Sequence, residues 1–234
     1  MSSQLELPES IRGVLFDCDG TILNSEPLHA ENLAIVVKSY GLNISAAEIS
    51  ERFRGFHDEQ VYDELFNENS SISKEEFLQK KTNSLLRQLN LLSLEDIKKL
   101  LTPGFMEAFE YLKKNKYLVA VVSASEEVFL ESLLNKLGIR SQLDILVHGS
   151  STLLPKPSPA PYLKAMRELE LHPDETVIFE DSATGLESAM ATGAETVKVI
   201  AHHDHEDDEH DSKEIVLTDN FFWLIKDRSK NIRL

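Results

Sequence analysis

The chain has 234 residues, of which 41% are hydrophobic and 27% charged, and it carries a formal net charge of −16 at pH 7. This length fits one large domain or one domain with a smaller insert. The acidic balance leaves no basic surface of the kind that binds a nucleic-acid backbone, so we expect neither nucleic acid nor an anionic membrane as a partner. Small anionic substrates stay open, because a local cation or a metal ion can outweigh the distant field.

The chain also lacks the sequence features of export and membrane insertion. No run approaches the roughly 18 consecutive apolar residues of a membrane helix. Residues 1–10 have neither the basic nor the apolar region of a secretory signal. The single cysteine, Cys18, cannot form an internal disulfide, which suits a reducing compartment. We therefore expect a soluble, cytoplasmic protein.

The first predicted element is a short buried strand at residues 14–17, which ends at polar residues and Gly20. Residues 25–100 then read as helix after helix, with capping boxes at Ser45-x-x-Glu48 and Ser73-x-x-Glu76. We interpret this stretch as an all-helical cap domain of residues 25–100, inserted directly after the first strand. Residues 1–24 and 101–234 would form the core.

After Pro103-Gly104, strands alternate with helices. Further apolar runs predict four strands, at residues 118–122, 144–147, 176–179 and 196–200. Apolar residues at helical spacing begin the intervening helices at Phe105, Leu130, Tyr162 and Leu186. This alternation predicts an α/β core, a doubly wound parallel sheet with helices on both faces. Such sheets bind ligands beyond the carboxyl ends of their strands.

One biased tract follows the last of these strands. Residues 202–211 are rich in His, Asp and Glu, which are ligand types that could bind Zn²⁺ or Ni²⁺ adventitiously. The alternative is a mobile acidic loop, because no spacing in the tract fixes a coordination geometry. The sequence assigns this tract no role.

Two carboxylates, Asp17 and Asp19, lie where the first strand ends. One could attack phosphorus as a nucleophile, and the other could protonate a leaving oxygen and then activate water. Gly20 would let the backbone turn sharply past a bulky anion. The alternative is an ordinary Asp-Gly surface turn.

Other polar residues follow the later strands. Ser123 ends the second strand, Lys156 lies in a proline-rich loop, and Glu180-Asp181 closes the fourth strand. Mg²⁺ takes oxygen ligands and keeps several waters, so Asp17, Asp181 and one backbone carbonyl would suffice to hold it. Each residue alone has a structural alternative: Ser123 as a helix cap, Lys156 as a solvated lysine and Glu180-Asp181 as a strand-end turn.

Taken in order, these motifs resemble the haloacid dehalogenase (HAD) superfamily, and most closely its β-phosphoglucomutase-like branch with a helical cap, of the sugar-phosphate or pseudouridine-monophosphate phosphatase type. The resemblance covers nearly the whole chain. The matching segments are Phe16-Asp17-Cys18-Asp19-Gly20-Thr21, Ser25-Glu26-Pro27-Leu28-His29, Arg54-Gly55, Pro103-Gly104, Ser123-Ala124-Ser125, Lys156-Pro157 and Phe179-Glu180-Asp181-Ser182-x-x-Gly185.

The resemblance implies a Rossmann-like core and a role for each matching residue. Asp17 would be the nucleophile, and Asp19 the general acid/base. Mg²⁺ would be bound by Asp17, Asp181 and the backbone carbonyl of Asp19, with Glu180 as a neighbour or a further ligand. The expected substrate contacts are Thr21, His29, Arg54, Ser123, Ala124 and Lys156. His29 could instead be a packed linker histidine, and Arg54 a solvated arginine.

Departures from the branch help to choose an activity. Where true β-phosphoglucomutases hold a second phosphate with Lys-Asn and a cap arginine, this chain has Glu126, Glu127 and Asp58. Acidic residues would repel that phosphate. We therefore expect a phosphatase that forms an aspartyl-phosphate on Asp17. The alternatives are a phosphosugar mutase and a non-catalytic binding protein.

The remaining expectations concern the substrate and the assembly. The substrate would be a small phosphorylated metabolite: a sugar phosphate, a sugar-acid phosphate or a nucleoside monophosphate. A monomer is plausible for a capped enzyme of this size.

Overall fold

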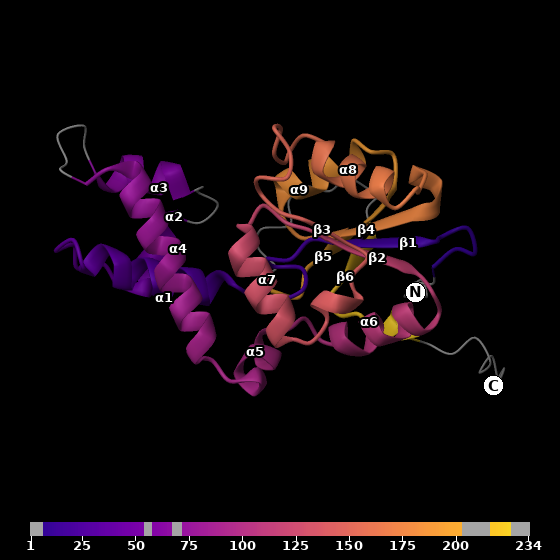
Figure 1. Ribbon diagram of the computed structural model, residues 1–234, viewed down its shortest axis with the longest axis horizontal. Helices are drawn as coiled ribbons and strands as arrows, with labels where there is room; N and C mark the ends of the chain where they lie inside the picture. Colours follow the sequence, from indigo (N-terminus) through magenta and orange to yellow (C-terminus); the bar gives the residue numbers. More distant parts are fainter. Residues whose placement is uncertain (1–6, 54–57, 67–71, 203–215, 226–234) are drawn as a thin grey trace. The chain divides into compact units, whose positions relative to one another are not determined.

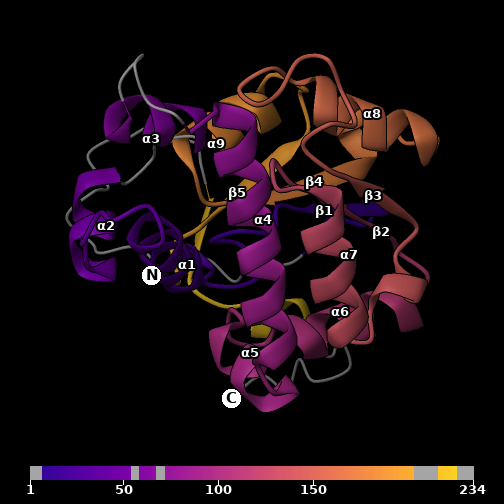
Figure 2. The same ribbon diagram turned by 60° about the vertical axis from the view of Figure 1, so that its left-hand side comes forward.

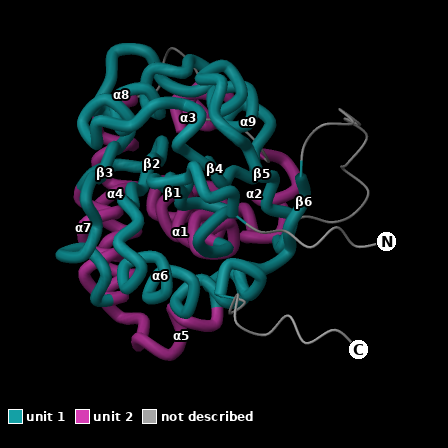
Figure 3. The backbone as a smooth tube through the Cα atoms, turned by 90° about the vertical axis from the view of Figure 1, so that its right-hand side faces the viewer, with its two compact units in different colours: residues 1–24, 100–127, 138–234 teal, residues 25–99, 128–137 magenta. Residues whose placement is uncertain are grey.

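The computed structural model describes residues 7–53, 58–66, 72–202 and 216–225. The chain divides into two compact units, shown in different colours in Figure 3. The first unit comprises residues 1–24, 100–127 and 138–234, and the second comprises residues 25–99 and 128–137.

Within the described residues, the first unit is built on a six-stranded, all-parallel sheet (Figure 1). Its strands are β1 Gly13–Phe16, β2 Leu118–Val122, β3 Ile145–Val147, β4 Thr176–Glu180, β5 Glu195–Val199 and β6 Val216–Thr218. Their order is β3-β2-β1-β4-β5-β6, so β1 is paired with β2 on one side and β4 on the other. The predicted doubly wound sheet is confirmed. Strand β6 was not predicted.

Helices cover both faces of this sheet. Helices α8 Ala160–Glu168 and α9 Ala183–Met190 lie together over one face, as Figures 1 and 2 show. Helix α6 Phe105–Lys114 packs against β2 and against the 3₁₀ helix η4 Phe222–Ile225 on the other. Two further 3₁₀ turns, η1 Arg140–Gln142 and η2 Pro173–Glu175, precede β3 and β4.

The strands carry a different apolar core on each face, because successive side chains of a strand point to opposite sides. Leu15 of β1 belongs to the cluster beneath α8 and α9. The next residue, Phe16, contacts the rings of Phe179, Phe105 and Phe221, with centroids 5.1, 5.5 and 5.4 Å away. Burial on both faces explains why each central strand reads as a continuous apolar run.

The second unit is helical. It contains α1 Glu26–Lys38, α2 Ala46–Phe53, α3 Asp58–Leu65, α4 Lys74–Leu91 and most of α5 Leu94–Leu100. The predicted capping box at Ser45 is present: the Ser45 amide donates to Glu48 Oε2 at 2.9 Å, and the Glu48 amide donates to Ser45 Oγ at 3.3 Å. At Ser73 the structure shows the N-cap half of the box, in which Oγ accepts from the Glu76 amide at 3.1 Å. Apolar residues from α1 to α4 form one cluster around the buried ring of Phe77. Among the described residues, no helix combines the length and the apolar content needed to cross a bilayer.

Helix α7 Glu127–Lys136 belongs to the second unit except for its first residue. Lys136 Nζ donates to the backbone carbonyls of Leu89, Asn90 and Leu92 at 2.7, 3.0 and 2.7 Å. These bonds fasten the end of α7 to the end of α4. The expected core of residues 101–234 includes α7, and the functional division into core and cap stays a prediction.

Candidate active site

The site begins where two neighbouring strands end. Phe16 of β1 is in register with Phe179 of β4, and the Asp17 amide donates to the Phe179 carbonyl at 2.9 Å. Asp17 therefore lies level with Glu180, the last residue of β4. Because β1 is where the strand order reverses, this is the switch point at which open α/β sheets bind ligands.

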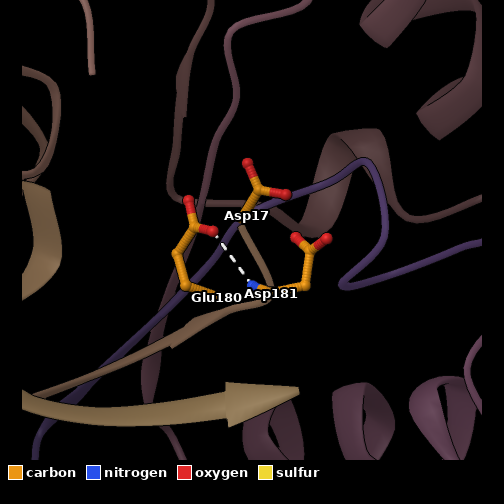
Figure 4. A group of neighbouring side chains, drawn as sticks. All are labelled: Asp17, Glu180 and Asp181. Carbon is orange, nitrogen blue, oxygen red and sulfur yellow. Dashed lines mark hydrogen bonds between the residues drawn. The ribbon is translucent and has the colours of Figure 1, made fainter. Parts of the chain in front are cut away.

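Three carboxylates converge at this edge. Asp17, Glu180 and Asp181 each place one oxygen so that all three lie within 4.8 Å of one another (Figure 4). All three residues are buried, with exposed fractions of 6%, 0% and 8%. Uncompensated charges at such burial are costly, so the group needs cations or donors beside it.

Lys156 supplies one cation. It lies in the loop after β3, and its side chain is only 8% exposed. Nζ donates to Asp17 Oδ1 at 2.7 Å, to Glu180 Oε1 at 2.5 Å and to the Val122 carbonyl at 3.0 Å. The lysine thus bridges the ends of β1, β2 and β4.

The electrostatics show that one lysine does not balance the group. Burial raises the pKa of Asp17 well above its usual value; Lys156 opposes this rise, and the carboxylates of Glu180, Asp181 and Asp19 add to it. For Lys156, burial opposes the charge, but Asp17 and Glu180 outweigh it and raise the pKa of the ammonium. The ammonium donates to two carboxylates, and two more act on Asp17, so carboxylates outnumber the cation.

The residues fit a hard divalent cation, which prefers carboxylate oxygens and would offset this excess. Asp17 and Asp181 are the best placed to hold it. Glu180 is less suited, because its two oxygens already accept from Lys156, Tyr162, the amides of Asp181 and Ser182, and Ser182 Oγ. A carboxylate offers about four acceptor positions, so these donors occupy it.

Asp19 is held from the β2 side. Its Oδ2 accepts from Ser123 Oγ at 3.2 Å and from Ser125 Oγ at 2.6 Å. The Ser125 amide in turn donates to Ser123 Oγ at 3.0 Å. Ser123 therefore lies beside the candidate acid/base, and Ser125 joins it there. In the sequence, the i, i+2 spacing of Ser123 and Ser125 was the available sign that both serines belong to the site.

The turn after Asp19 packs tightly against Asp181. Gly20 has φ +87°, and a Cβ there would lie 2.0 Å from Asp181 Oδ2, so only glycine fits. Thr21 Oγ1 donates to Asp181 Oδ1 at 3.1 Å. The Thr21 carbonyl accepts from Thr102 Oγ1, which also contacts His202 Nε2 at 2.8 Å. The hydroxyl of Thr21, expected to contact substrate, here orients the carboxylate of Asp181.

Three other predicted substrate contacts, Ala124, His29 and Arg54, stay predictions. Ala124 is exposed in the loop after β2. That loop is close to the next one, because the Gly149 amide donates to the Ser125 carbonyl at 2.9 Å and a Cβ on Gly149 would lie 2.3 Å from the Ala124 carbonyl. His29 lies on α1 in the second unit, with its ring 5.7 Å from that of Phe129. Arg54 falls outside the described residues, as does the biased tract beyond His202.

One member of the polar group was not predicted to belong to the site. Tyr162 of α8 donates its hydroxyl to Glu180 Oε1 at 2.9 Å. In the sequence it occupies an apolar helix position, which indicates core packing and says nothing about the hydroxyl.

Known proteins share sequence and fold with this chain. The sequence model of the family described as haloacid dehalogenase-like hydrolase matches residues 14–199, from β1 to β5. The chain belongs to this family. The resemblance read from the motifs and the prediction of a hydrolytic enzyme are therefore confirmed.

Curated relatives of this HAD-like hydrolase cover most of its length. A "phosphorylated carbohydrates phosphatase" of Thermotoga maritima is 26% identical over 192 residues, 82% of this chain and 86% of the relative. The "hexitol phosphatase B" of Escherichia coli is 28% identical over 199 residues, 84% of this chain and 87% of the relative.

Solved structures share the fold. A HAD hydrolase, family IA, variant 3, of Entamoeba histolytica superposes with a TM-score of 0.77 at 24% identity, covering 91% of this chain and 94% of the other. The β-phosphoglucomutase of Clostridium difficile gives 0.70 at 22% identity, covering 90% and 92%.

Proposed function

We propose that this HAD-like hydrolase is a Mg²⁺-dependent phosphatase that hydrolyses a small organic phosphate monoester through an aspartyl-phosphate on Asp17. The observation that carries the proposal is the buried group at the switch point of the sheet. There Asp17 is joined to Lys156 and lies beside Asp181, in surroundings with more carboxylate than ammonium charge. That group offers a nucleophile, a cation and metal ligands in one place.

The proposed cycle has two transfers. An oxygen of Asp17 attacks phosphorus while the bond from phosphorus to the ester oxygen breaks, and Asp19 gives its proton to the departing alkoxide. Water then gives a proton to Asp19 and attacks the same phosphorus. The bond to Asp17 breaks, and inorganic phosphate leaves. General acid/base assistance of this kind contributes about 10²–10⁴-fold.

The other residues bind and orient. Lys156 would exchange its bond to Asp17 for one to a phosphoryl oxygen and keep its bonds to Glu180 and the Val122 carbonyl. Ser123 and Ser125 would hold the carboxylate of Asp19 at 3.2 and 2.6 Å so that it faces the ester oxygen. Mg²⁺, held by Asp17, Asp181 and the Asp19 carbonyl, would supply neutralisation of phosphoryl charge. Positioning and electrostatics provide most of the acceleration in phosphoryl transfer.

Phosphorylated sugars and polyols are the substrate class that we favour. The support is the naming of two relatives as phosphatases of phosphorylated carbohydrates and of hexitol phosphates. Sugar-acid phosphates and nucleoside monophosphates are the next to test, since the carboxylate–lysine group would contact only the phosphoryl end. Mutase chemistry is disfavoured by the acidic residues Glu126, Glu127 and Asp58 at the positions expected for a second phosphate.

The proposal is tested by phosphate release from a panel of phosphomonoesters, with Mg²⁺ and with a chelator. We expect release that requires Mg²⁺, and in ¹⁸O-water one labelled oxygen in each phosphate. Isomerised sugar phosphate without release would instead indicate a mutase. If no ester is hydrolysed or isomerised, the hypothesis that remains is a non-catalytic binding protein.

A matched pair of variants tests the metal assignment. Asp181→Asn should weaken Mg²⁺ activation by at least about tenfold, because a carboxylate ligand is lost. Asp174→Asn serves as the control, since Asp174 is exposed in η2 before β4, at the opposite edge of the sheet. Equal Mg²⁺ dependence in both variants would contradict the assignment.

A further inference from the structure

Tyr162 joins the apolar core to the polar site. It is fully buried, and its ring packs in the cluster between the sheet and helices α8 and α9. Its hydroxyl leaves that cluster and donates to Glu180 Oε1 at 2.9 Å. A buried tyrosine needs a partner for its hydroxyl, but a backbone carbonyl would serve as well. Here the partner is the carboxylate that holds Lys156.

The donors of Glu180 are divided between its two oxygens. Oε2 accepts from the amides of Asp181 and Ser182 at 3.0 and 3.2 Å and from Ser182 Oγ at 3.2 Å, all from the turn that follows β4. Oε1 accepts from Lys156 and Tyr162. The turn after β4 therefore fixes one oxygen, and two side chains from other parts of the chain fix the other.

Close packing leaves this carboxylate little freedom. A Cβ on Gly185 would lie 1.9 Å from Oε1 and 2.0 Å from Cδ of Glu180, so the glycine provides the space the carboxylate fills. The Gly185 amide donates to Ser182 Oγ at 3.1 Å, which holds this first turn of α9 in place. Tyr162 closes the remaining side.

Tyr162 also contacts the lysine directly. Lys156 Nζ lies 4.8 Å from the centroid of the phenol ring, within the range of a cation–π contact. The ring therefore borders the ammonium while the hydroxyl fixes one of the carboxylates to which the ammonium donates. Burial, followed by the charge of Glu180, raises the pKa of the phenol well above its usual value, so the hydroxyl stays a donor at working pH.

We propose that Tyr162 is a positioning residue for phosphoryl transfer, whose ring and hydroxyl together fix Lys156 Nζ where it meets the phosphoryl group. This inference rests on the proposed function and adds to it a residue that does not touch substrate. The hydroxyl limits the rotation of Glu180, and Glu180 limits the travel of Nζ. An ammonium misplaced by a fraction of an ångström stabilises the transferring group less well.

The test removes only the hydroxyl. Tyr162→Phe keeps the ring beneath Lys156, and Tyr111→Phe on α6 is the control, since it removes a tyrosine hydroxyl from a half-buried helix position of the same unit. We expect Tyr162→Phe to lower kcat by roughly 5- to 20-fold, with KM changed less than about threefold and the thermal midpoint within a few degrees. Tyr111→Phe should leave kcat and KM unchanged.

A double-mutant cycle separates positioning from simple packing. The affinity for inorganic phosphate in the presence of Mg²⁺ is measured by calorimetry for the wild type, Tyr162→Phe, Lys156→Met and the double variant. If Tyr162 acts through Lys156, removing its hydroxyl weakens phosphate binding severalfold in the wild type and changes nothing once Lys156 is gone. If the two residues act independently, the effects of their substitutions on phosphate affinity would add instead.

The outcomes are distinct. Unchanged kcat in folded Tyr162→Phe, independent effects in the cycle, or failure of Tyr162→Phe to fold would each overturn the inference, because each assigns Tyr162 to packing alone. A wild type that binds phosphate but hydrolyses no ester would overturn the proposed function. In that case, the calorimetric cycle would still decide the role of Tyr162.

Discussion

Each unit of the molecule buries a lysine side chain, and the two lysines differ in how exposed their partners are. In the sheet unit, Lys156 is 8% exposed and bonds to Asp17 and Glu180, whose side chains are 9% and 0% exposed. In the helical unit, the Lys81 side chain is 11% exposed and pairs with Asp58, whose side chain is 46% exposed. One lysine is enclosed with its partners, whereas the other reaches a partner that water also solvates.

The surroundings differ in charge as well. Beside Lys81 the polar groups are matched: Asn32 donates to the Lys81 carbonyl at 2.9 Å and accepts from Gln88 Nε2 at 2.8 Å. Beside Lys156, further carboxylates act on Asp17 and raise its pKa. Buried charge without a matching partner is costly to a fold. Such unmatched charge is therefore the stronger sign of a functional site.

The largest expected effect removes the nucleophile from the unbalanced group. Asp17→Asn should lower the rate of phosphate release by at least about 10³-fold, because no other carboxylate can form the acyl phosphate. Without Mg²⁺, its thermal midpoint should equal or exceed that of the wild type, since one of the mutually repelling carboxylates is gone. Asp174→Asn should keep full activity. Near-normal turnover by Asp17→Asn would remove the proposed mechanism.

The same substitution at the two lysines tests the comparison directly. Lys156→Met should lose activity by at least about 10²-fold and, without Mg²⁺ at neutral pH, about 3 kcal/mol of unfolding free energy, because buried carboxylates lose their cation. Lys81→Met should keep kcat and lose only about 1 kcal/mol, since water can solvate Asp58. Urea unfolding and steady-state assays measure both. Equal losses of unfolding free energy in the two variants would contradict the difference proposed between the two lysines.

A smaller effect is expected at the glycine that makes room for Glu180. Glycine to alanine within a helix ordinarily stabilises it by about 1 kcal/mol. Gly185→Ala should instead cost about 1–3 kcal/mol and reduce kcat, because the new Cβ overlaps the Glu180 carboxylate. Thr184→Ala, at the exposed neighbouring position, should change the unfolding free energy by less than about 0.5 kcal/mol. A stabilised, fully active Gly185→Ala would contradict the packing described here.

The smallest effect belongs to an exposed group of α5. Bonds from Lys99 and Ser93 lower the pKa of Asp96 to about 2. Since the folded pKa lies below that of the unfolded chain, about 3.9, the contribution of Asp96 to stability is complete above pH 4 and is lost as the pH falls toward 2. The difference in urea midpoint between wild type and Asp96→Asn should shrink over that window and in high salt. A difference that is independent of pH would remove the ionic origin of this contact.

Much of the fold could be predicted from the sequence. The five strands that it predicted are present within one residue of their expected ends, and the helices expected after Phe105 and before Gly138 are α6 and α7. Local patterns succeed here because a strand buried on both faces must be apolar throughout, whereas a helix repeats every 3.6 residues. Grouping α7 with the second unit depends on Lys136 bonding to carbonyls more than forty positions away, which no local pattern shows.

The residue types of the site and their order along the chain could be predicted from local patterns. Asp17, Ser123, Lys156 and Asp181 follow apolar runs, and the parallel arrangement of those runs places their ends at one edge. How the side chains pair could not be predicted in this way, because pairing depends on distances between strands that are far apart in the chain. The apolar helix pattern gives no sign that the Tyr162 hydroxyl bonds to Glu180 or that its ring contacts Lys156.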